Sequence, residues 1–528
     1  MDNREKEKEE RKHLFNSTEK SDFIVNMTEK QYQKLGFIYL ALSTLVLFVM
    51  SIPYYVSKGA LVFSFSNINT LQTMKYVNFA RIASKCSGYI SYLQIALYAV
   101  SFIGFLILII SATKKYFKAG ENKLFILPVI YLLFVVVSTF MAYDIKCAFF
   151  GKDYRYNGML TLFSYIGLFV AASQINSRSR RKTYLDIFLS ISLINAVYGI
   201  LQTVSGLVEK LPNFFYDMLY INGRERVSYE HFIADGLVQS PHALAALMTM
   251  AAAIAAAGLV YDKSKVRKVF CAVCVGACSA AGFLTCTVAG YVGVPFALLV
   301  VLVIEIIRAA AFRKNSPKNK FGVLFALCSV LLAAAAFAVV ALTDRAYLYD
   351  SNIIWTDSAY RLGVAFPESS NISSWHIYPK LWKECLNMLE KSWILGSGPD
   401  CIGFGYYGTT ILYDANLGFT TDRSYNEYFD LALACGIPCL LIYLSMGFVT
   451  IKKGIACVKK FFVGEDSWTA VALLAAVLGY GLQANVNISI ITVTPFFFIF
   501  VGLLWNKPHI DTAATSTNIK KKERKMRK

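Results

Sequence analysis

The stretch Asp422-Arg423-Ser424-Tyr425-Asn426-Glu427-Tyr428 lies where a polar segment meets the apolar run 428–450. The polar segment extends back to residue 344, and it is the longest break in a chain whose other connections are mostly short. Long connections in compact proteins tend to carry function, because loops tolerate the residues that binding and catalysis need. We therefore expect the functional site in or beside residues 344–427.

The apolar character of the chain excludes an ordinary soluble protein. Hydrophobic residues make up 56% and charged residues 16% of the sequence, and the mean hydropathy is +0.48. A membrane core of ~30 Å takes about 20 apolar residues to cross as a helix. About twelve runs qualify, at 35–57, 89–112, 124–142, 158–175, 183–205, 242–261, 267–286, 289–307, 321–343, 428–450, 467–484 and 489–505. The sequence predicts an all-α integral membrane protein of about 12 transmembrane helices, with one large, partly helical extracytoplasmic loop between the ninth and tenth.

Orientation follows from the distribution of Lys and Arg. Basic residues cluster in alternate connections, at 114–123, 178–182, 263–268, 308–320 and 452–460. The connections between them carry fewer. Because cytoplasmic loops are enriched in Lys and Arg, both termini are predicted to be cytoplasmic and the large loop to face outward. The expected location is the cytoplasmic membrane, which the chain crosses many times.

Five parts follow from this topology. They are a cytoplasmic, disordered N-terminal segment (1–34), a bundle of about nine spans (35–343), an extracytoplasmic loop domain (344–427), the last three transmembrane helices (428–505) and a basic cytoplasmic tail (506–528). The net charge of +19 lies mostly in cytoplasmic loops and the tail, near anionic lipid headgroups, so it requires no nucleic-acid partner.

The loop domain contains one predicted helix and one candidate disulfide. Residues from His376 to about Trp393 alternate apolar and polar positions with helical periodicity, which predicts an amphipathic helix. Cys385 and Cys401 share the loop, and they are either bonded to each other or free.

The motifs of this region resemble a known family. Trp382 is followed by Gly396-Ser397-Gly398-Pro399-Asp400, then by the stretch 422–428 and by Gly436-Ile437-Pro438. This order resembles the O-antigen ligase and O-antigen polymerase superfamily, integral-membrane glycosyltransferases that take glycans from a polyprenyl diphosphate. Weaker similarities to family motifs occur at 155–161, 195–202, 226, 239–242 and 285–290. The chain departs from the family pattern at Tyr425, where the family has His, and at Val288-Ala289, where it has Arg.

Transfer from a diphosphate requires cations that offset the charge developing on the leaving group. Arginine suits this task, because its guanidinium binds phosphate in a bidentate manner and stays charged. The candidates for diphosphate and glycan binding are Arg155, Arg226, Arg361, Arg423 and, within the last motif, Asn426. For each arginine, an ion-paired or surface role is the alternative.

A second requirement is a group that accepts the proton of the attacking hydroxyl. The candidates are Tyr425, His376 and Glu427. Tyr425 has an ordinary pKa of ~10, so it suits orientation of the acceptor better than proton abstraction. No Asp-x-Asp motif occurs in a predicted outer loop, and we expect neither a metal ion nor another cofactor.

The resemblance implies a metal-independent transferase that moves a glycan from a polyprenyl-diphosphate-linked donor to a hydroxyl of a surface glycan or lipid acceptor. Membrane lipids are expected to surround the protein and contact its apolar helices. Two alternatives remain open from the sequence. One is a family relative without transferase activity, suggested by Tyr425, and the other is a lipid or polysaccharide exporter, suggested by the number of spans.

Overall fold

The computed structural model describes most of the chain between residues 29 and 505. The described residues are 29–51, 55–57, 60–62, 92–113, 123–151, 156–174, 177–207, 234, 236–238, 240–311, 374–402, 412–414, 419–421, 423–464 and 466–505. Their elements are α2 (Glu29–Ser51), β1 (Tyr55–Ser57), β2 (Ala60–Val62), α4 (Tyr92–Thr113), η2 (Lys123–Phe125), α5 (Ile126–Phe140), α6 (Ile145–Phe150), α7 (Met159–Ala172), α8 (Arg178–Leu207), α10 (Pro241–Tyr261), α11 (Lys265–Leu284), α12 (Val288–Ala311), α16 (Ser374–Ser392), β3 (Leu412–Asp414), β4 (Phe419–Thr421), α17 (Glu427–Cys435), α18 (Ile437–Phe462), α19 (Thr469–Gln483), η5 (Ala484–Val486) and α20 (Thr494–Trp505). The strands form two short antiparallel hairpins, β1 with β2 and β3 with β4.

The described helices confirm an all-α membrane protein. Seven of them, α2, α8, α10, α11, α12, α18 and α19, are long and apolar enough to cross a membrane. Shorter apolar helices occur in α4, α5, α7 and α20. The predicted run 321–343 lies outside the described residues, as do about half of the predicted loop domain, residues 1–28 of the N-terminal segment and the tail 506–528. The last residues of the N-terminal segment, 29–34, belong to α2.

Two predicted runs differ in their limits from the helices that form. The helix predicted at 35–57 begins earlier, at Glu29, and ends at Ser51, and a strand follows at β1. The run 428–450 is divided at Gly436, whose φ of 88° is a conformation that residues with a Cβ rarely adopt. Pro438 then lies in the first turn of α18, a position that proline favours. Because α18 continues to Phe462, the basic residues predicted in a loop at 452–460 belong to this helix instead.

The core of the bundle is α10, which is buried almost from end to end. It packs against α11, α12 and α19. Nine of its 21 residues are alanines, and small side chains let neighbouring helices approach closely, which is how apolar helices gain packing energy in a membrane. By contrast, large apolar side chains such as Phe102, Leu133 and Phe448 are exposed on the outer helices α4, α5 and α18. Such faces suit lipid chains rather than water.

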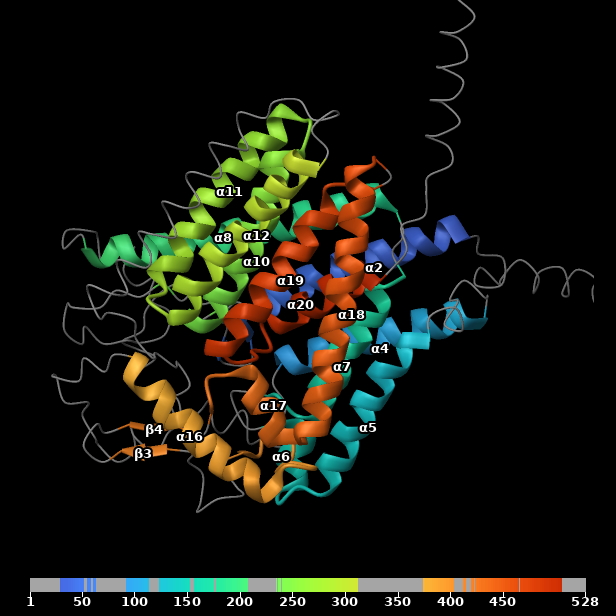
Figure 1. Ribbon diagram of the computed structural model, residues 1–528. Coiled ribbons are helices and arrows are strands. Elements are labelled where there is room, and N and C mark those ends of the chain that lie inside the picture. The colour runs from blue at the N-terminus through green and yellow to red at the C-terminus, as the bar shows by residue number, and fades with distance from the viewer. Residues whose placement is uncertain are drawn as a thin grey trace, which may run out of the picture.

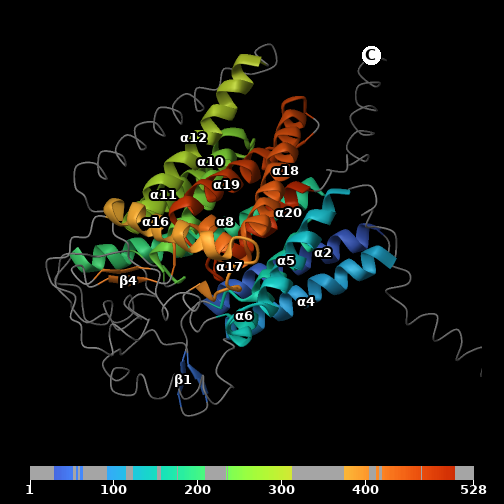
Figure 2. The same cartoon turned by 60° about the horizontal axis from the view of Figure 1, so that its bottom comes forward.

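The two ends of the bundle differ in charge. At one end α8 begins and α10 ends, and Lys182 pairs with Asp262 at 2.6 Å while Arg181 pairs with Asp466 at 3.3 Å. At the other end α10 begins, and α6, α16 and α17 are gathered there (Figure 1). Turning the molecule brings α16 and α17 forward (Figure 2). α17 lies beside the end of α5, where the Ser138 hydroxyl donates to the carbonyl of Ala434, and it is followed directly by the start of α18. This second end, which carries the polar motifs, is the candidate functional site.

Candidate functional site

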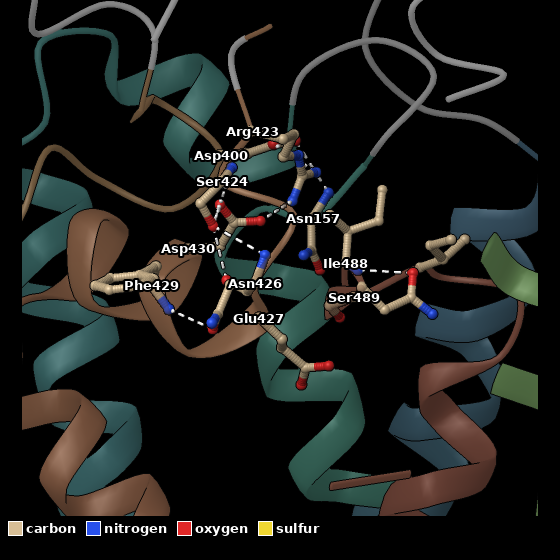
Figure 3. Close-up of polar contacts among 12 residues, drawn as sticks. Asn157, Asp400, Arg423, Ser424, Asn426, Glu427, Phe429, Asp430, Ile488 and Ser489 are labelled. Carbon is tan, nitrogen blue, oxygen red and sulfur yellow. Dashed lines mark hydrogen bonds and ion pairs between the residues drawn. The ribbon is translucent and has the colours of Figure 1, made fainter. Parts of the chain in front are cut away.

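The start of α17 is built from the motif 423–428. Asn426 has extended backbone angles, and its Oδ1 accepts hydrogen bonds from the backbone N–H groups of Tyr428, at 3.0 Å, and Phe429, at 3.2 Å. It is therefore the N-cap of the helix, because it satisfies amides that have no partner within the first turn. The side-chain oxygen predicted to bind substrate is thus engaged in capping (Figure 3).

Asp430, in the first turn of α17, binds Ser424, which precedes the helix. Its Oδ1 accepts hydrogen bonds from the backbone N–H of Ser424 at 2.9 Å and from the Ser424 hydroxyl at 2.7 Å. The Ser424 carbonyl in turn accepts a hydrogen bond from Nε1 of Trp382 at 3.2 Å. Trp382 belongs to α16, so this contact fixes the amphipathic helix against the motif.

Arg423 lies between two carboxylates. Its Nη2 is 3.1 Å from Oδ1 of Asp400 and its Nη1 is 3.5 Å from Oδ2 of Asp430. All three side chains are buried, and a buried charge is stable only when it is paired. The ion pairs join the turn at 396–400 to the start of α17, and they give the group one negative charge more than positive.

The turn Gly396-Ser397-Gly398-Pro399-Asp400 packs on the end of α17. The N–H groups of Ser397 and Gly398 donate to the carbonyls of Leu433 at 2.8 Å and Ala434 at 2.9 Å, which are among the last carbonyls of the helix. The turn requires a φ of 69° at Gly396 and 101° at Gly398. A Cβ built on Gly398 would also overlap the Cβ of Ala142, so glycine is required here for space as well as conformation.

Two further motifs reach this site from distant parts of the chain. The backbone N–H of Asn157, just before α7, donates to Oδ2 of Asp400 at 3.2 Å. The ring of His242, in the first turn of α10, lies with its centroid 5.6 Å from that of Tyr425. Tyr425 is fully buried and has a φ of 51°, a left-handed conformation that costs a non-glycine residue of the order of 1 kcal/mol. Segments that are far apart in sequence therefore meet around 423–428.

Glu427, the first residue of α17, faces the interior of the bundle. Its Oε1 accepts a hydrogen bond from the Tyr443 hydroxyl and its Oε2 one from the Tyr480 hydroxyl, both at 3.0 Å. The Tyr480 hydroxyl also lies 3.0 Å from Oγ1 of Thr494. Burial raises the pKa of Glu427 to about 7, with Asp430 adding to this and the two tyrosines opposing it. The carboxyl group therefore changes its protonation near neutral pH.

A cavity of about 50 Å³ separates Glu427 from the ion-paired group. Its polar lining includes Asn157, Arg423, Glu427, Asp430 and Ser489. The buried Oδ1 of Asn157 has no hydrogen-bond partner among the described residues. A cavity of this size and polarity has room for a small number of water molecules, and it is too small for a sugar.

The other predicted site residues are placed only in part. Arg155, Arg226 and Arg361 lie outside the described residues. His376 belongs to α16, and the position of its side chain lies outside the description too.

The candidate disulfide between Cys385 and Cys401 is not formed. No bond joins their sulfur atoms, and the two residues belong to different clusters of buried side chains. Cys385 lies on the buried face of α16, within the main core. Cys401 packs instead with Ala142, Cys147 and Ala148, which come from the region of α6.

Sequence reasoning missed the partners of Glu427 and Arg423. Tyr443 and Tyr480 lie on α18 and α19, in apolar runs where aromatic residues are frequent, so nothing in the sequence distinguishes them. Asp430 gave one signal, because an acidic residue in the first turn of a helix is favourable.

Comparisons with known proteins add no relative. The sequence matches no protein-family model, and no curated protein matches it.

Proposed function

We propose that this protein is an O-antigen ligase-like glycosyltransferase of the bacterial cytoplasmic membrane. It moves a glycan from a polyprenyl diphosphate carrier to a hydroxyl group of a surface glycan or lipid acceptor. The observation that carries the proposal is the convergence of four motifs that resemble those of the family. Asn157, Asp400, Arg423 and His242 belong to these four motifs. Asn157 contacts Asp400, which pairs with Arg423, and His242 contacts Tyr425 of the same motif as Arg423.

In the proposed reaction, the acceptor hydroxyl oxygen attacks the anomeric carbon of the donor sugar. The bond between this carbon and the phosphate oxygen breaks, and its electron pair leaves with the diphosphate. Glu427 accepts the proton of the hydroxyl through water in the cavity, since the cavity has no room for the sugar itself. This role fits its pKa of about 7, because a general base acts best when its pKa lies near the working pH.

Arg423 is assigned a positioning role. Its guanidinium already donates to Asp400 and Asp430, and a group with excess negative charge does not attract a diphosphate. Charge on the leaving group is then offset by Arg155, Arg226 and Arg361, the other arginines predicted from the sequence. Asn426 likewise shapes the site through its cap.

The proposed topology has about twelve spans, cytoplasmic termini and the site on the extracytoplasmic side. The charge difference between the two ends of the bundle supports it. Lys182, Arg181 and Arg267 gather at the end opposite to the site, which agrees with the enrichment of basic residues on the cytoplasmic side.

A relative without transferase activity is the second candidate. Tyr425 replaces the family's histidine, and it is fully buried against His242 rather than directed into the cavity lining. In this reading the four motifs hold the fold together, and the site binds a lipid-linked glycan without transferring it.

Reconstituted vesicles that carry a lipid-linked oligosaccharide and a fluorescent acceptor separate the two candidates. The proposal expects a labelled product of higher mass, and it expects Glu427→Gln to abolish this product while the donor still binds. Glu390→Gln, on the exposed face of α16, is the matched control and should be fully active. Donor binding without any product in the native protein would favour the second candidate.

A further inference from the structure

Two thiols lie next to each other beside the site. Cys147 is on α6 and Cys401 directly follows Asp400, so they are far apart in sequence, and both are buried. The Cys401 Sγ lies 3.5 Å from the carbonyl oxygen of Asp144, and the Cys147 Sγ lies 3.8 Å from that of Asp400. Each sulfur thus reaches into the other's segment, and the two thiols contact each other.

Their surroundings leave little room for another role. The cluster that holds them contains otherwise only Ala142 and Ala148, and among the described residues no group of side chains there could hold a metal ion. A disulfide bond joins sulfur atoms at ~2.0 Å, and it requires that the two cysteines already lie side by side, as these two do.

We propose that Cys147 and Cys401 form a disulfide bond in the mature protein. The oxidant is a disulfide-bearing compound or protein of the extracytoplasmic space. A Cys thiolate attacks it to give a mixed disulfide, the second Cys thiolate displaces the reduced carrier, and the carrier leaves as two thiols. The two Cys protons pass to these thiols, so atoms and electrons balance.

This inference rests on the proposed orientation, because disulfides persist in oxidising compartments. Contact with Cys147 and burial raise the pKa of the Cys401 thiol, which disfavours the reactive thiolate in the folded protein. The bond therefore forms during folding, before α6 covers the turn. Once formed, it fixes α6 to the residue after Asp400, and so holds the carboxylate that pairs with Arg423.

Differential alkylation of the full-length protein tests the bond. Cells are lysed in denaturant with light N-ethylmaleimide, then disulfides are reduced and labelled with the heavy reagent. We expect Cys147 and Cys401 to carry the heavy label almost completely, and Cys385 to carry the light one. Cys147→Ser should convert Cys401 to the light label, whereas the control Cys385→Ser should leave it heavy.

The inference is overturned if Cys147 and Cys401 are light in the native protein, or if Cys401 stays heavy in Cys147→Ser. A second measurement separates this failure from that of the proposed function. Trp393, at the end of α16, is exposed, and Trp393→Cys is treated with a membrane-impermeant maleimide on intact cells. If Trp393→Cys is labelled while Cys147 and Cys401 carry the light reagent, the disulfide proposal fails and the proposed orientation stands. If Trp393→Cys is not labelled, the site faces the cytoplasm, and both the disulfide proposal and the proposed function fail.

Discussion

Glu427→Gln should stabilise the protein above neutral pH while it removes activity. Burial raises the pKa of Glu427 from 4.5 to about 7, which means that the folded state disfavours its ionised form. A carboxyl group with a raised folded pKa contributes most favourably below its unfolded pKa, and this contribution is lost as the pH rises through about 7. The shift corresponds to a cost of about 3 kcal/mol for the ionised form at pH 8 to 9. Glutamine carries no charge and avoids this cost.

The hydrogen bonds around the side chain should survive the substitution. The glutamine oxygen still accepts from one tyrosine, and its amide donates to the other. The Tyr480 hydroxyl can turn its own proton toward Oγ1 of Thr494, which lies 3.0 Å away. The gain in stability is therefore the electrostatic cost of ionising Glu427, reduced by any loss of hydrogen-bond geometry.

Thermal unfolding in detergent between pH 4.5 and 9 measures this difference. We expect the Tm of the variant to equal that of the native protein near pH 4.5 and to exceed it by roughly 2–5 °C at pH 9. The exposed control Glu390→Gln should show no such divergence. In the transferase assay, the rate of the native protein should rise through pH 7 as Glu427 loses its proton. A Tm difference that does not depend on pH, or that grows toward acid, would refute the reasoning.

Three substitutions test the frame around this group by thermal unfolding. Gly398→Ala introduces a Cβ at a φ of 101° with a neighbouring side chain in its place, so we expect a loss of roughly 1–3 kcal/mol. The control Gly447→Ala meets nothing within 4 Å on α18 and should stabilise by up to about 1 kcal/mol. Arg423→Ala leaves two buried carboxylates unpaired and should cost roughly 3–5 kcal/mol, against no measurable change for the exposed Lys383→Ala. Asn426→Ala removes the cap of α17 and should cost about 1 kcal/mol, most of which Asn426→Asp should restore. Equal Tm values for a variant and its control would contradict the role assigned to that residue.

Apolar periodicity and length predict helices well here, and fail where a backbone conformation interrupts an apolar run. The stretch 428–450 is continuous by hydropathy, and yet Gly436 divides it into a short helix and a long one. The break between the two helices is indicated in the sequence by Gly436-Ile437-Pro438. The glycine permits a backbone with positive φ, and the proline favours the first turn of the next helix.

The sequence predicts which consecutive residues of the motif lie together, but not their contacts with distant segments. Tyr425, Asn426 and Glu427 lie together because they follow one another, but the direction of each side chain depends on how α17 packs. The ion pair of Arg423 with Asp400 and the contact of Cys401 with Cys147 depend on the turn at 396–400 docking onto α17. The sequence left open whether Cys385 and Cys401 are bonded. The structure shows that they are not, because the two residues pack in different clusters of buried side chains.

In the stretch 423–428, Arg423 holds the geometry of the site and Glu427 is the proposed base. Arg423 is surrounded by negative charge and ties the turn to α17, so it holds the geometry of the site. That negative charge also acts on Glu427, since Asp430 helps to raise its pKa. Asp430 thus adds to the effect of burial, which raises the pKa of Glu427 to about 7. The excess negative charge of the group around Arg423 also repels anions. The proposed binding of a diphosphate therefore depends on cations other than Arg423, and Arg155, Arg226 and Arg361 are the predicted candidates.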